Sequence, residues 1–282
     1  MSPKVHILLP VHNRCAITSR FIDCLATQTY SNYHLVLIDD GSTDGTAEMV
    51  QTKIRNLTVL KGRGDWWWAG SLQQGIDWLK DKAISSDDIV LMINDDVEIP
   101  PDFIETACAL LKPGMLMQAA ICDDATREVL DIGVIYEDQK MLFRAPKQGE
   151  AVNCLTTNGL FVCWRDLQLV GDFYPRLLPH YLSDYEFTMR AYKKGLALSV
   201  PANLKLYWNR QTTGFREIKE DSLLPFLKKF FSKKAAGNPV YWTNFLLLAG
   251  SMKYLPLHLL RIWKGALFSI AKHVFFPQDK RS

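Results

Sequence analysis

The stretch "IVLMINDDVEIPPDF", Ile89–Phe103, combines an unbroken apolar run with two adjacent carboxylates. A short apolar run bounded by polar residues is typical of a buried strand. Asp95 and Asp96 follow that run after Asn94, and two like charges at the end of a buried strand repel each other. The stretch therefore predicts a strand whose end needs a positive partner.

Apolar runs alternate with helical patterns through the first hundred residues. The predicted strands are Val5–Pro10, His34–Ile38, Leu57–Leu60 and Ile89–Ile93. The predicted helices are Cys15–Gln28, a segment starting at Ser42 or Asp44 and ending at Val50, and Ser71–Lys82. This alternation predicts an α/β fold with a mostly parallel sheet flanked by helices.

The second hundred residues are less regular. Strands are predicted at Met115–Ile121, Val129–Ile135, Leu160–Trp164, Ala197–Val200 and Leu204–Trp208. Helices are predicted at Pro101–Leu111 and at Ser183–Lys194, where Gly195 provides a C-cap. We expect these elements to complete one domain.

Charge divides the chain into two parts. Residues 215–282 hold 12 Lys and Arg against four acids, so they carry +8, whereas the whole chain has a formal net charge of only +3. Residues 1–214 must therefore carry −5. We predict an acidic domain at 1–214 and a basic, amphipathic helical extension at 215–282.

The extension mixes apolar and aromatic residues with Lys and Arg. Its longest uncharged run, Ala235–Met252, contains Gly237 and Pro239 and makes a poor spanning helix. An anionic membrane surface is the expected partner. Packing on the body or on a second copy in a homodimer is the alternative. Without a recognisable signal peptide, we expect a cytoplasmic protein, peripheral at the inner face of the cell membrane.

Polar side chains follow three of the predicted strands. Pro10 and "VHNR" follow the first, Asp39 and Asp40 the second, and "NDD" the fourth. Ends of parallel strands share one edge, which is where open α/β sheets bind ligands. Crowded carboxylates suit Mg²⁺ or Mn²⁺ bridging a diphosphate. No Walker A sequence and no dinucleotide-binding glycine motif is present.

Four segments in this order resemble the inverting family 2 glycosyltransferases, which have a GT-A fold, a Rossmann-like, mostly parallel sheet flanked by helices. The segments are "ILLPVHNR" (7–14), "LIDDGSTDGTAEMV" (37–50), "LMINDDVEIPPDFIE" (91–105) and "GDFYPRLLPHYLSDYEFTMRAYKKG" (171–195). A fifth segment, "GDWWWAGSLQQGI" (64–76), is similar to bacterial rhamnosyltransferase-like members.

The resemblance implies a nucleotide-sugar site at the sheet edge. Pro10, His12 and Arg14 would line the nucleotide pocket, and Asp40 would contact the base or ribose. Asp95 would contact ribose or sugar.

The "NDD" triplet would be the family's metal motif. Asp96 would be the best metal ligand, with Asn94 where an acid is more usual. Many relatives have a further His ligand near the position of Trp208 and Asn209. Arg210 and Arg216 could offset diphosphate charge in its place.

The same resemblance makes Asp184 the catalytic base, which takes a proton from the attacking acceptor hydroxyl. Glu186, two residues on, lies on another helix face and would orient the acceptor. Among three consecutive tryptophans at least one must line a cleft, so we expect Trp67 to stack on the donor and Trp68 to face the acceptor.

The sequence thus predicts transfer of a hexosyl or rhamnosyl group from a UDP- or dTDP-sugar. The acceptor would be a hydroxyl of a glycan or polyprenyl-diphosphate-linked saccharide in bacterial cell-surface polysaccharide synthesis. Two alternatives stay open: a non-catalytic nucleotide-sugar or glycan-binding protein of the same fold, and a nucleotidyltransferase. A nucleic-acid partner is not expected, because the basic residues lie among aliphatic ones.

Overall fold

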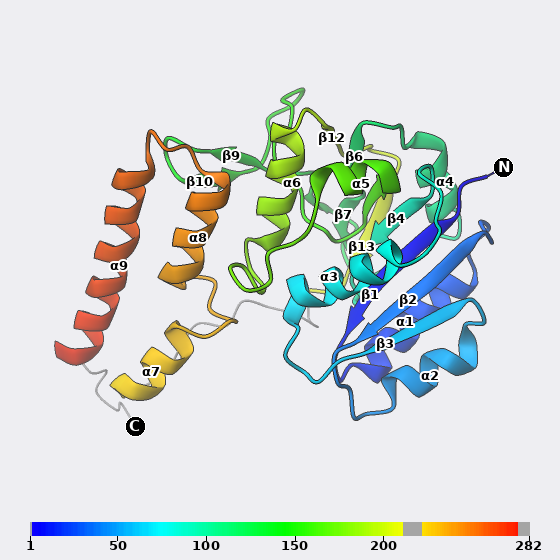
Figure 1. Ribbon diagram of the computed structural model, residues 1–282, viewed down its shortest axis with the longest axis horizontal. Helices are drawn as coiled ribbons and strands as arrows, with labels where there is room; N and C mark the ends of the chain where they lie inside the picture. The colour runs from blue at the N-terminus through cyan, green and yellow to red at the C-terminus, as the bar shows by residue number, and fades with distance from the viewer. Residues whose placement is uncertain (1, 211–221, 276–282) are drawn as a thin grey trace.

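A seven-stranded sheet with helices on both faces organises the first two hundred residues (Figure 1). The structure is a computed structural model and describes residues 2–210 and 222–275. The strand order is β12-β6-β11-β4-β1-β2-β3, and the strands β4, β1, β2 and β3 are parallel. The predicted α/β fold class is confirmed.

The parallel half of the sheet comes from the first 92 residues. Its strands are β1 (Val5–Val11), β2 (Tyr33–Asp39), β3 (Leu57–Lys61) and β4 (Ile89–Met92). Its helices are α1 (Cys15–Ala26), α2 (Thr46–Lys53) and α3 (Trp67–Lys80). These elements agree with the sequence prediction to within a few residues at their ends.

Alternation along β1 explains why both faces of the sheet are covered. Ile7 and Leu9 pack in one core cluster with Phe21 of α1, whereas Leu8 packs in the opposite cluster with Leu72 of α3. Successive strand side chains point to opposite faces, so an all-apolar strand requires helices on both sides.

The other half of the sheet is antiparallel at one strand. It contains β6 (Met115–Gln118), β11 (Leu160–Cys163) and β12 (Ala197–Ser199), and β11 pairs antiparallel with both β4 and β6. A smaller sheet has the order β5-β13-β7-β8, formed by β5 (Val97–Glu98), β13 (Lys205–Trp208), β7 (Ala120–Asp123) and β8 (Val129–Asp131).

Two segments that were each predicted as one continuous strand form two strands in the structure. Met115–Ile121 divides into β6 and β7 at Ala119, because Ala119 bonds to the Gly159 carbonyl while Ala120 bonds to the Leu204 carbonyl. Val129–Ile135 divides into β8 and β9 (Ile135–Glu137), with Gly133 at φ +90° between them. β9 pairs instead with β10 (Leu142–Arg144).

Three helices cover the ends of this second half. They are α4 (Phe103–Leu110), α5 (Trp164–Val170), which the sequence analysis did not predict, and α6 (Ser183–Lys193). Residues of α5 and α6 join α3 in the same core cluster. The start of α6 is thereby held against the sheet.

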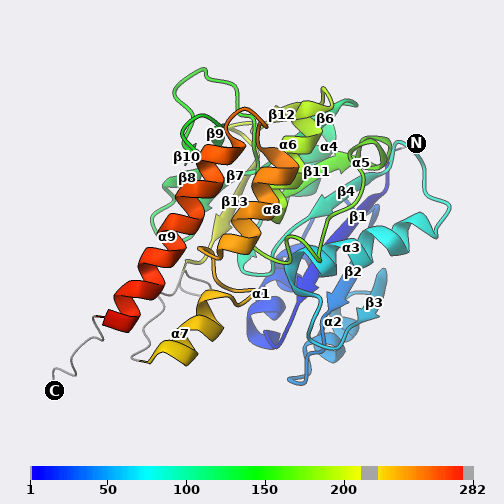
Figure 2. The ribbon, with the colours of Figure 1, turned by 60° about the vertical axis from the view of Figure 1, so that its left-hand side comes forward.

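The C-terminal extension forms the helices α7 (Leu223–Phe230), α8 (Pro239–Ala249) and α9 (Leu255–Phe275). α8 packs on α6, and Figure 2 shows α9 beside α8. Phe245 and Leu246 of α8 are buried in a third cluster with Leu178 and Met189. The extension is therefore joined to the body by an apolar interface.

The outward face of the extension keeps apolar side chains in solvent. They include Leu247, Leu257, Leu260, Leu267 and Phe268. Within residues 2–210 and 222–275, no helix is both long and apolar enough to cross a membrane.

Candidate active site

The three predicted polar strand ends meet at one edge of the sheet. The register pairs Val11 with Asp39 and Leu8 with Met92, so β1, β2 and β4 finish side by side. Pro10 is half-buried within β1 and pairs with Ile38. The residues that follow each strand are thus brought to a common edge, as the alternation of elements predicted.

The Asp40 side chain is buried and hydrogen-bonds to the backbone of a neighbouring loop. Its carboxylate accepts hydrogen bonds from the backbone N–H groups of Gly64 at 2.8 Å, Trp66 at 2.9 Å and Trp67 at 3.2 Å. The exposed His12 lies with Nδ1 2.6 Å from the Asp40 carbonyl oxygen. Asp40 therefore fixes the 64–67 loop over the sheet edge.

Asp95 and Asp96 share one cation, the guanidinium of Arg14. Arg14 Nε lies 3.1 Å from Asp95 Oδ1, and Nη2 lies 3.2 Å from Asp96 Oδ2. Asp95 also accepts the Thr18 hydroxyl at 2.7 Å, and Trp208 Nε1 donates to Asp96 at 3.3 Å. Burial raises the pKa of Asp95 to about 6, while Arg14 and Thr18 oppose that rise. The positive partner expected from the sequence is present as Arg14.

Asn94 leaves a hydrogen-bond acceptor unused. Its backbone N–H donates to Asn158 Oδ1 at 3.2 Å, while its own Oδ1 is buried and has no hydrogen-bond partner among the described residues. Two carboxylates and an amide oxygen are ligands that Mg²⁺ and Mn²⁺ prefer. The donor set fits a hard cation, although Arg14 would have to release part of its hold on Asp96.

No cluster of three or more His, Cys, Asp or Glu side chains suited to a metal occurs in the described part of the chain. At the position where relatives carry a histidine, Trp208 donates to Asp96 instead. Arg210 is exposed and lies 3.9 Å from Asp123 Oδ2. Arg216 lies outside the described residues.

Asp184 lies in the first turn of α6. Among the described contacts, no cation is paired with its carboxylate. Burial raises the pKa of its carboxyl to about 6, and the negative charge of Asp131 adds to the rise. The backbone N–H groups of Tyr185 and Thr157 hydrogen-bond the carboxylate, and Tyr185 N lies 3.0 Å from Oδ1. A buried carboxyl poised near neutrality can accept a proton from a substrate.

The segment Thr157–Asn158 links the two carboxylate regions. Asn158 holds the backbone of Asn94, and Thr157 hydrogen-bonds Asp184. The Thr157 hydroxyl also accepts the indole N–H of Trp68 at 2.9 Å. This segment and Asp131 were not predicted as site residues, because "TTNG" and "LDIG" are ordinary turn sequences.

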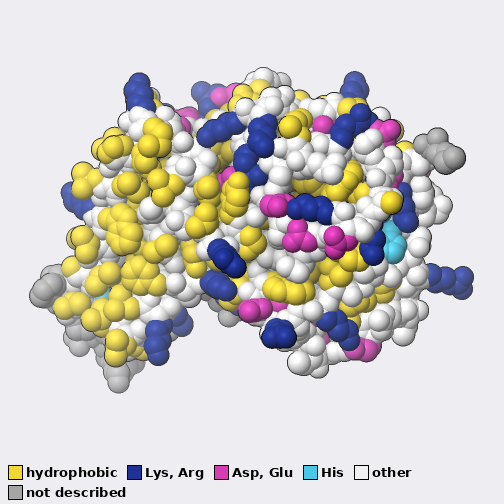
Figure 3. Space-filling model, in the orientation of Figure 1, with side chains coloured by type: hydrophobic (Ala, Val, Ile, Leu, Met, Phe, Trp, Pro, Cys, Tyr) yellow, Lys and Arg dark blue, Asp and Glu magenta, His cyan; other side chains and the backbone are white. Residues whose placement is uncertain are grey.

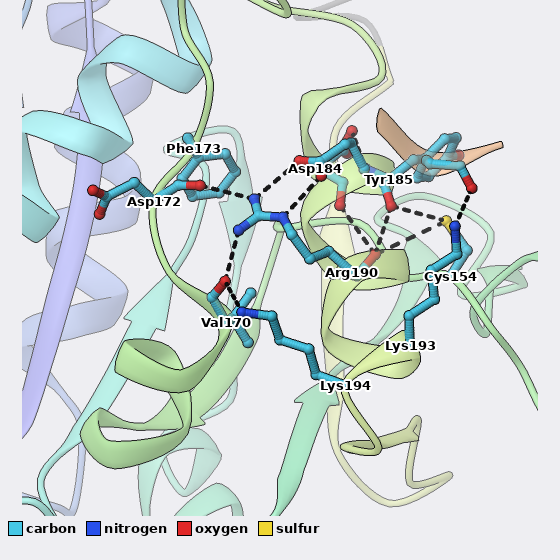
Figure 4. Close-up of polar contacts among 12 residues, drawn as sticks. Cys154, Val170, Asp172, Phe173, Asp184, Tyr185, Arg190, Lys193 and Lys194 are labelled. Atoms are coloured by element: carbon cyan, nitrogen blue, oxygen red, sulfur yellow. Dashed lines mark hydrogen bonds and ion pairs between the residues drawn. The ribbon is translucent and has the colours of Figure 1, made fainter. Parts of the chain in front are cut away.

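Glu186 has a packing role rather than an open carboxylate. It is 2% exposed and pairs twice with Arg190, at 2.8 Å and 3.0 Å. Figure 4 shows Arg190 reaching from α6 to the carbonyls of Val170 and Asp172. These contacts occupy Glu186 in holding Arg190 and α6 in place, and its predicted role in orienting an acceptor stays a prediction.

The three tryptophans have different surroundings, and the predicted roles of Trp67 at the donor and Trp68 at the acceptor stay predictions. Trp66 and Trp68 pack against the core cluster beneath α3. Trp67 does not, and its ring meets the His180 ring edge-on at 6.1 Å between centroids. Because Trp68 uses its N–H on Thr157, Trp67 is the freer of the two to meet a ligand.

Backbone strain is concentrated in these loops. Asn13, Trp67 and Leu182 have φ values of 51°, 60° and 68°, and they are three of the five non-glycine residues with positive φ in the described ranges. A positive φ is a conformational outlier for a bulky residue, and such outliers gather at functional sites. Asn13 lies between His12 and Arg14, Trp67 is itself a predicted donor contact, and Leu182 lies two residues before Asp184.

Comparison with known proteins agrees with this geometry. Residues 6–130 match the family described as Glycosyl transferase family 2. An uncharacterized glycosyltransferase of Haemophilus influenzae is 42% identical over 53 residues, 18% of this chain and 21% of that protein. One of Rickettsia bellii is 35% identical over 48 residues, 17% of this chain and 7% of that protein. The matches thus span about a fifth or less of these relatives.

Solved structures match over nearly the whole chain. S. aureus TarS 1–349 in complex with UDP-GlcNAc has a TM-score of 0.60 at 15% identity, over 96% of this chain and 81% of that one. The mannosyltransferase PcManGT of Pyrobaculum calidifontis, in complex with GDP-Man and Mn²⁺, has a TM-score of 0.59 at 16% identity, over 98% and 88%. The chain therefore has the GT-A fold, and the match to the Glycosyl transferase family 2 model is confined to residues 6–130.

Proposed function

We propose that this protein is an inverting glycosyltransferase that moves a hexosyl or rhamnosyl group from a nucleotide-diphosphate sugar to a hydroxyl of a glycan or lipid-linked acceptor. The observation that carries the proposal is the pair of unlike carboxylate regions joined through Thr157–Asn158. Burial raises the pKa of both Asp95 and Asp184 to about 6, but only the Asp95–Asp96 region is paired with a cation, Arg14, among the described contacts.

The donor would lie at the edge formed by β1, β2 and β4. His12 and the 64–67 loop border that edge, and Arg14 brings positive charge to it. TarS and PcManGT have been solved with UDP-GlcNAc and GDP-Man, which supports a nucleotide-sugar partner. We expect a UDP- or dTDP-sugar donor.

The cation, when bound, would stabilise the charge that grows on the leaving diphosphate. Asp96 and the unused Oδ1 of Asn94 are the residues that would hold it. Arg14 would then pair with Asp95 and support the diphosphate from the other side. The Mn²⁺ in PcManGT supports this choice of ion.

Asp184 would act on the acceptor. Its carboxylate takes the proton of the attacking hydroxyl as the new glycosidic bond forms on the face opposite the leaving group. Direct displacement inverts the anomeric carbon and needs no covalent intermediate. The contacts from Tyr185 and Thr157 would keep the carboxylate in place.

The extension would bring the enzyme to its acceptor. Exposed Leu260, Leu267 and Phe268 lie on α9 with Arg261 and Lys264, which suits an anionic membrane surface. We propose peripheral association at the inner face of the cell membrane, in cell-surface polysaccharide synthesis.

The experiment has two stages. Thermal unfolding is measured with UDP, dTDP and GDP and their sugars, with and without Mn²⁺, because a ligand that binds the native state raises the midpoint. The best donor is then incubated with a bacterial lipid extract, and release of nucleotide diphosphate is followed for wild type and Asp184→Asn.

We expect one nucleotide class to stabilise the protein, and more so with Mn²⁺. Asp184→Asn should lose about two to four orders of magnitude in turnover, the usual contribution of a general base. A protein that no nucleotide stabilises, or an Asp184→Asn variant that turns over as wild type does, would contradict the proposal.

A further inference from the structure

Two lysines of the extension reach back over the 64–67 loop. Lys233 and Lys234 follow α7, and their Nζ atoms lie 5.6 Å and 5.4 Å from the centroid of the Trp67 ring. Lys233 Nζ also lies 3.5 Å from the Asp65 carbonyl oxygen. Two ammonium groups are thereby brought to one indole, beside the loop that Asp40 fixes.

The Trp67 ring also contacts His180, which lies in the loop that leads to Asp184. His180 meets Trp67 edge-on, and its Nδ1 is buried without a hydrogen-bond partner among the described residues. Burial and the nearby Lys234 lower the pKa of His180 to about 4, so the ring is neutral at physiological pH. A neutral ring can present one N–H group or one lone pair to a ligand.

The cluster formed by Trp67, His180, Lys233 and Lys234 suits an anion with several oxygens. No carboxylate is paired with Lys233 or Lys234 within the described contacts, although both contact the Trp67 ring. Two ammonium groups that contact one indole ring are like charges without a paired carboxylate, and a bound dianion would offset them. Charge-assisted contacts to phosphate oxygens are among the strongest hydrogen bonds.

Exposed apolar side chains lie on either side of the two lysines in sequence. Phe231, Val240 and Leu247 are 40%, 41% and 56% exposed and lie on the segments that flank the lysines in sequence. Figure 3 shows hydrophobic side chains gathered over the C-terminal helices, with Lys and Arg side chains beside them toward the body. A ligand with an anionic head and an apolar tail would contact both surfaces.

We propose that Lys233 and Lys234, with Trp67 and His180, bind the diphosphate of a polyprenyl-diphosphate-linked acceptor. The inference rests on the proposed function and assigns its acceptor class and the residues that recognise it. The donor has its own cation at Arg14, whereas His180 lies four residues before Asp184, where the acceptor hydroxyl must arrive. The tail would lie along the exposed side chains of α7 and α8.

The test measures binding of farnesyl diphosphate by calorimetry, below the concentration at which it forms micelles. Inorganic diphosphate and farnesol serve as probes of the head and the tail alone. The variant is Lys233→Gln with Lys234→Gln, and the matched control is Lys264→Gln with Lys272→Gln, which removes two charges from α9. Binding of the preferred nucleotide diphosphate is measured on every variant.

We expect farnesyl diphosphate to bind wild type more tightly than either partial probe. The Lys233/Lys234 variant should lose about tenfold or more in that affinity, since two charge-assisted contacts disappear. The control pair should bind the probe within about twofold of wild type, and all variants should keep nucleotide binding, which also shows that they are folded.

Three results would overturn the inference. They are absence of farnesyl diphosphate binding by wild type, equal losses in the two lysine pairs, and a loss in the Lys233/Lys234 variant confined to nucleotide diphosphate. The last would assign the lysines to the donor. Failure of wild type to bind any nucleotide would instead reject the proposed function, so the two failures are distinguishable.

Discussion

The two carboxylate regions of the site have the same residue type and opposite electrostatic settings. Asp95 and Asp96 end a buried strand and share the guanidinium of Arg14. Asp184 starts a helix, has backbone N–H partners and lies in the field of a second carboxylate, Asp131. Burial raises the pKa of Asp95 and of Asp184 to about 6, but in the first region the cation Arg14 opposes the rise, whereas the second region has no paired cation among the described contacts.

This difference separates binding from chemistry. A cation-paired carboxylate cluster suits a charged ligand such as a metal-bound diphosphate, because its charge is already balanced and can be exchanged. Asp184, whose pKa is also raised to about 6 but which has no paired cation among the described contacts, suits proton transfer near neutral pH. Substitutions at Arg14, Asp184 and Thr18 each change one of the two regions, and we expect their effects on the free energy of unfolding to decrease in that order.

Removing the cation should have the largest effect on stability. Arg14→Met leaves Asp95 and Asp96, both 4% exposed, as neighbouring buried carboxylates without their shared partner. We expect a loss of about 2–4 kcal/mol in the free energy of unfolding, measured by urea denaturation at pH 7.5. Mg²⁺ should restore part of that loss, since the released oxygens and Asn94 Oδ1 can bind it.

The matched control is Arg20→Met, which removes an exposed arginine from the same helix. We expect it to change stability by no more than about 0.5 kcal/mol, with or without Mg²⁺. Similar losses for the two variants, or an Arg14→Met protein that Mg²⁺ does not stabilise, would mean that Arg14 does not hold the carboxylates together.

Removing the charge of Asp184 should stabilise the protein at neutral pH. Its pKa is raised from 3.8 to about 6 through burial, so the folded state holds the proton more tightly than the unfolded chain does. The stabilising contribution of the protonated carboxyl is complete below pH 4 and is lost as the pH rises through 6. At pH 7.5 the buried charge therefore costs about 2–3 kcal/mol.

Asp184→Asn should recover that cost. We expect the variant to be more stable than wild type at pH 7.5 and to lose its advantage near pH 4, measured by urea denaturation at both values. Asp81→Asn, at an exposed position after α3, provides the control and should show no such crossover. A variant that is less stable than wild type at pH 7.5 would show that Asp184 has a stabilising partner.

Removing one hydrogen bond from the first region should have the smallest effect. Thr18 is fully buried and donates its hydroxyl proton to Asp95 at 2.7 Å. Thr18→Val keeps the shape and should cost about 1–2 kcal/mol. Thr52→Val removes an exposed hydroxyl that bonds the Met49 carbonyl and should cost less. Equal losses in the free energy of unfolding for Thr18→Val and Thr52→Val would show that the hydrogen bond from Thr18 to Asp95 contributes no more than an exposed one.

The sequence predicted the parallel half of the fold well because its signals are local. Continuous apolar runs such as Ile89–Ile93 can only be buried strands in this pattern, and their order in the chain sets their polar ends on one edge. The breaks at Ala119 and Gly133 were missed, because a change of strand partner depends on residues such as Gly159 and Leu204 that are distant in sequence.

The sequence indicated the carboxylates of the candidate site but not the residues that contact them. Asp40, Asp95 and Asp184 stand out beside apolar runs and a helix start, but their partners are set by tertiary contacts. Nothing in the sequence indicated that Asp40 would hold the 64–67 loop or that Thr157 would contact Asp184. The approach of Lys233 to Trp67 joins residues 166 positions apart in sequence.

The central claim is that Asp95 and Asp96 bind the donor, whereas Asp184 carries out the chemistry. It is tested most directly by calorimetry, which measures binding of the preferred nucleotide sugar, with Mn²⁺, to wild type, Asp96→Asn and Asp184→Asn. We predict that Asp96→Asn weakens binding about tenfold or more, whereas Asp184→Asn binds within about twofold of wild type and releases no nucleotide diphosphate. An Asp184→Asn variant that loses donor binding as severely as Asp96→Asn would contradict the account.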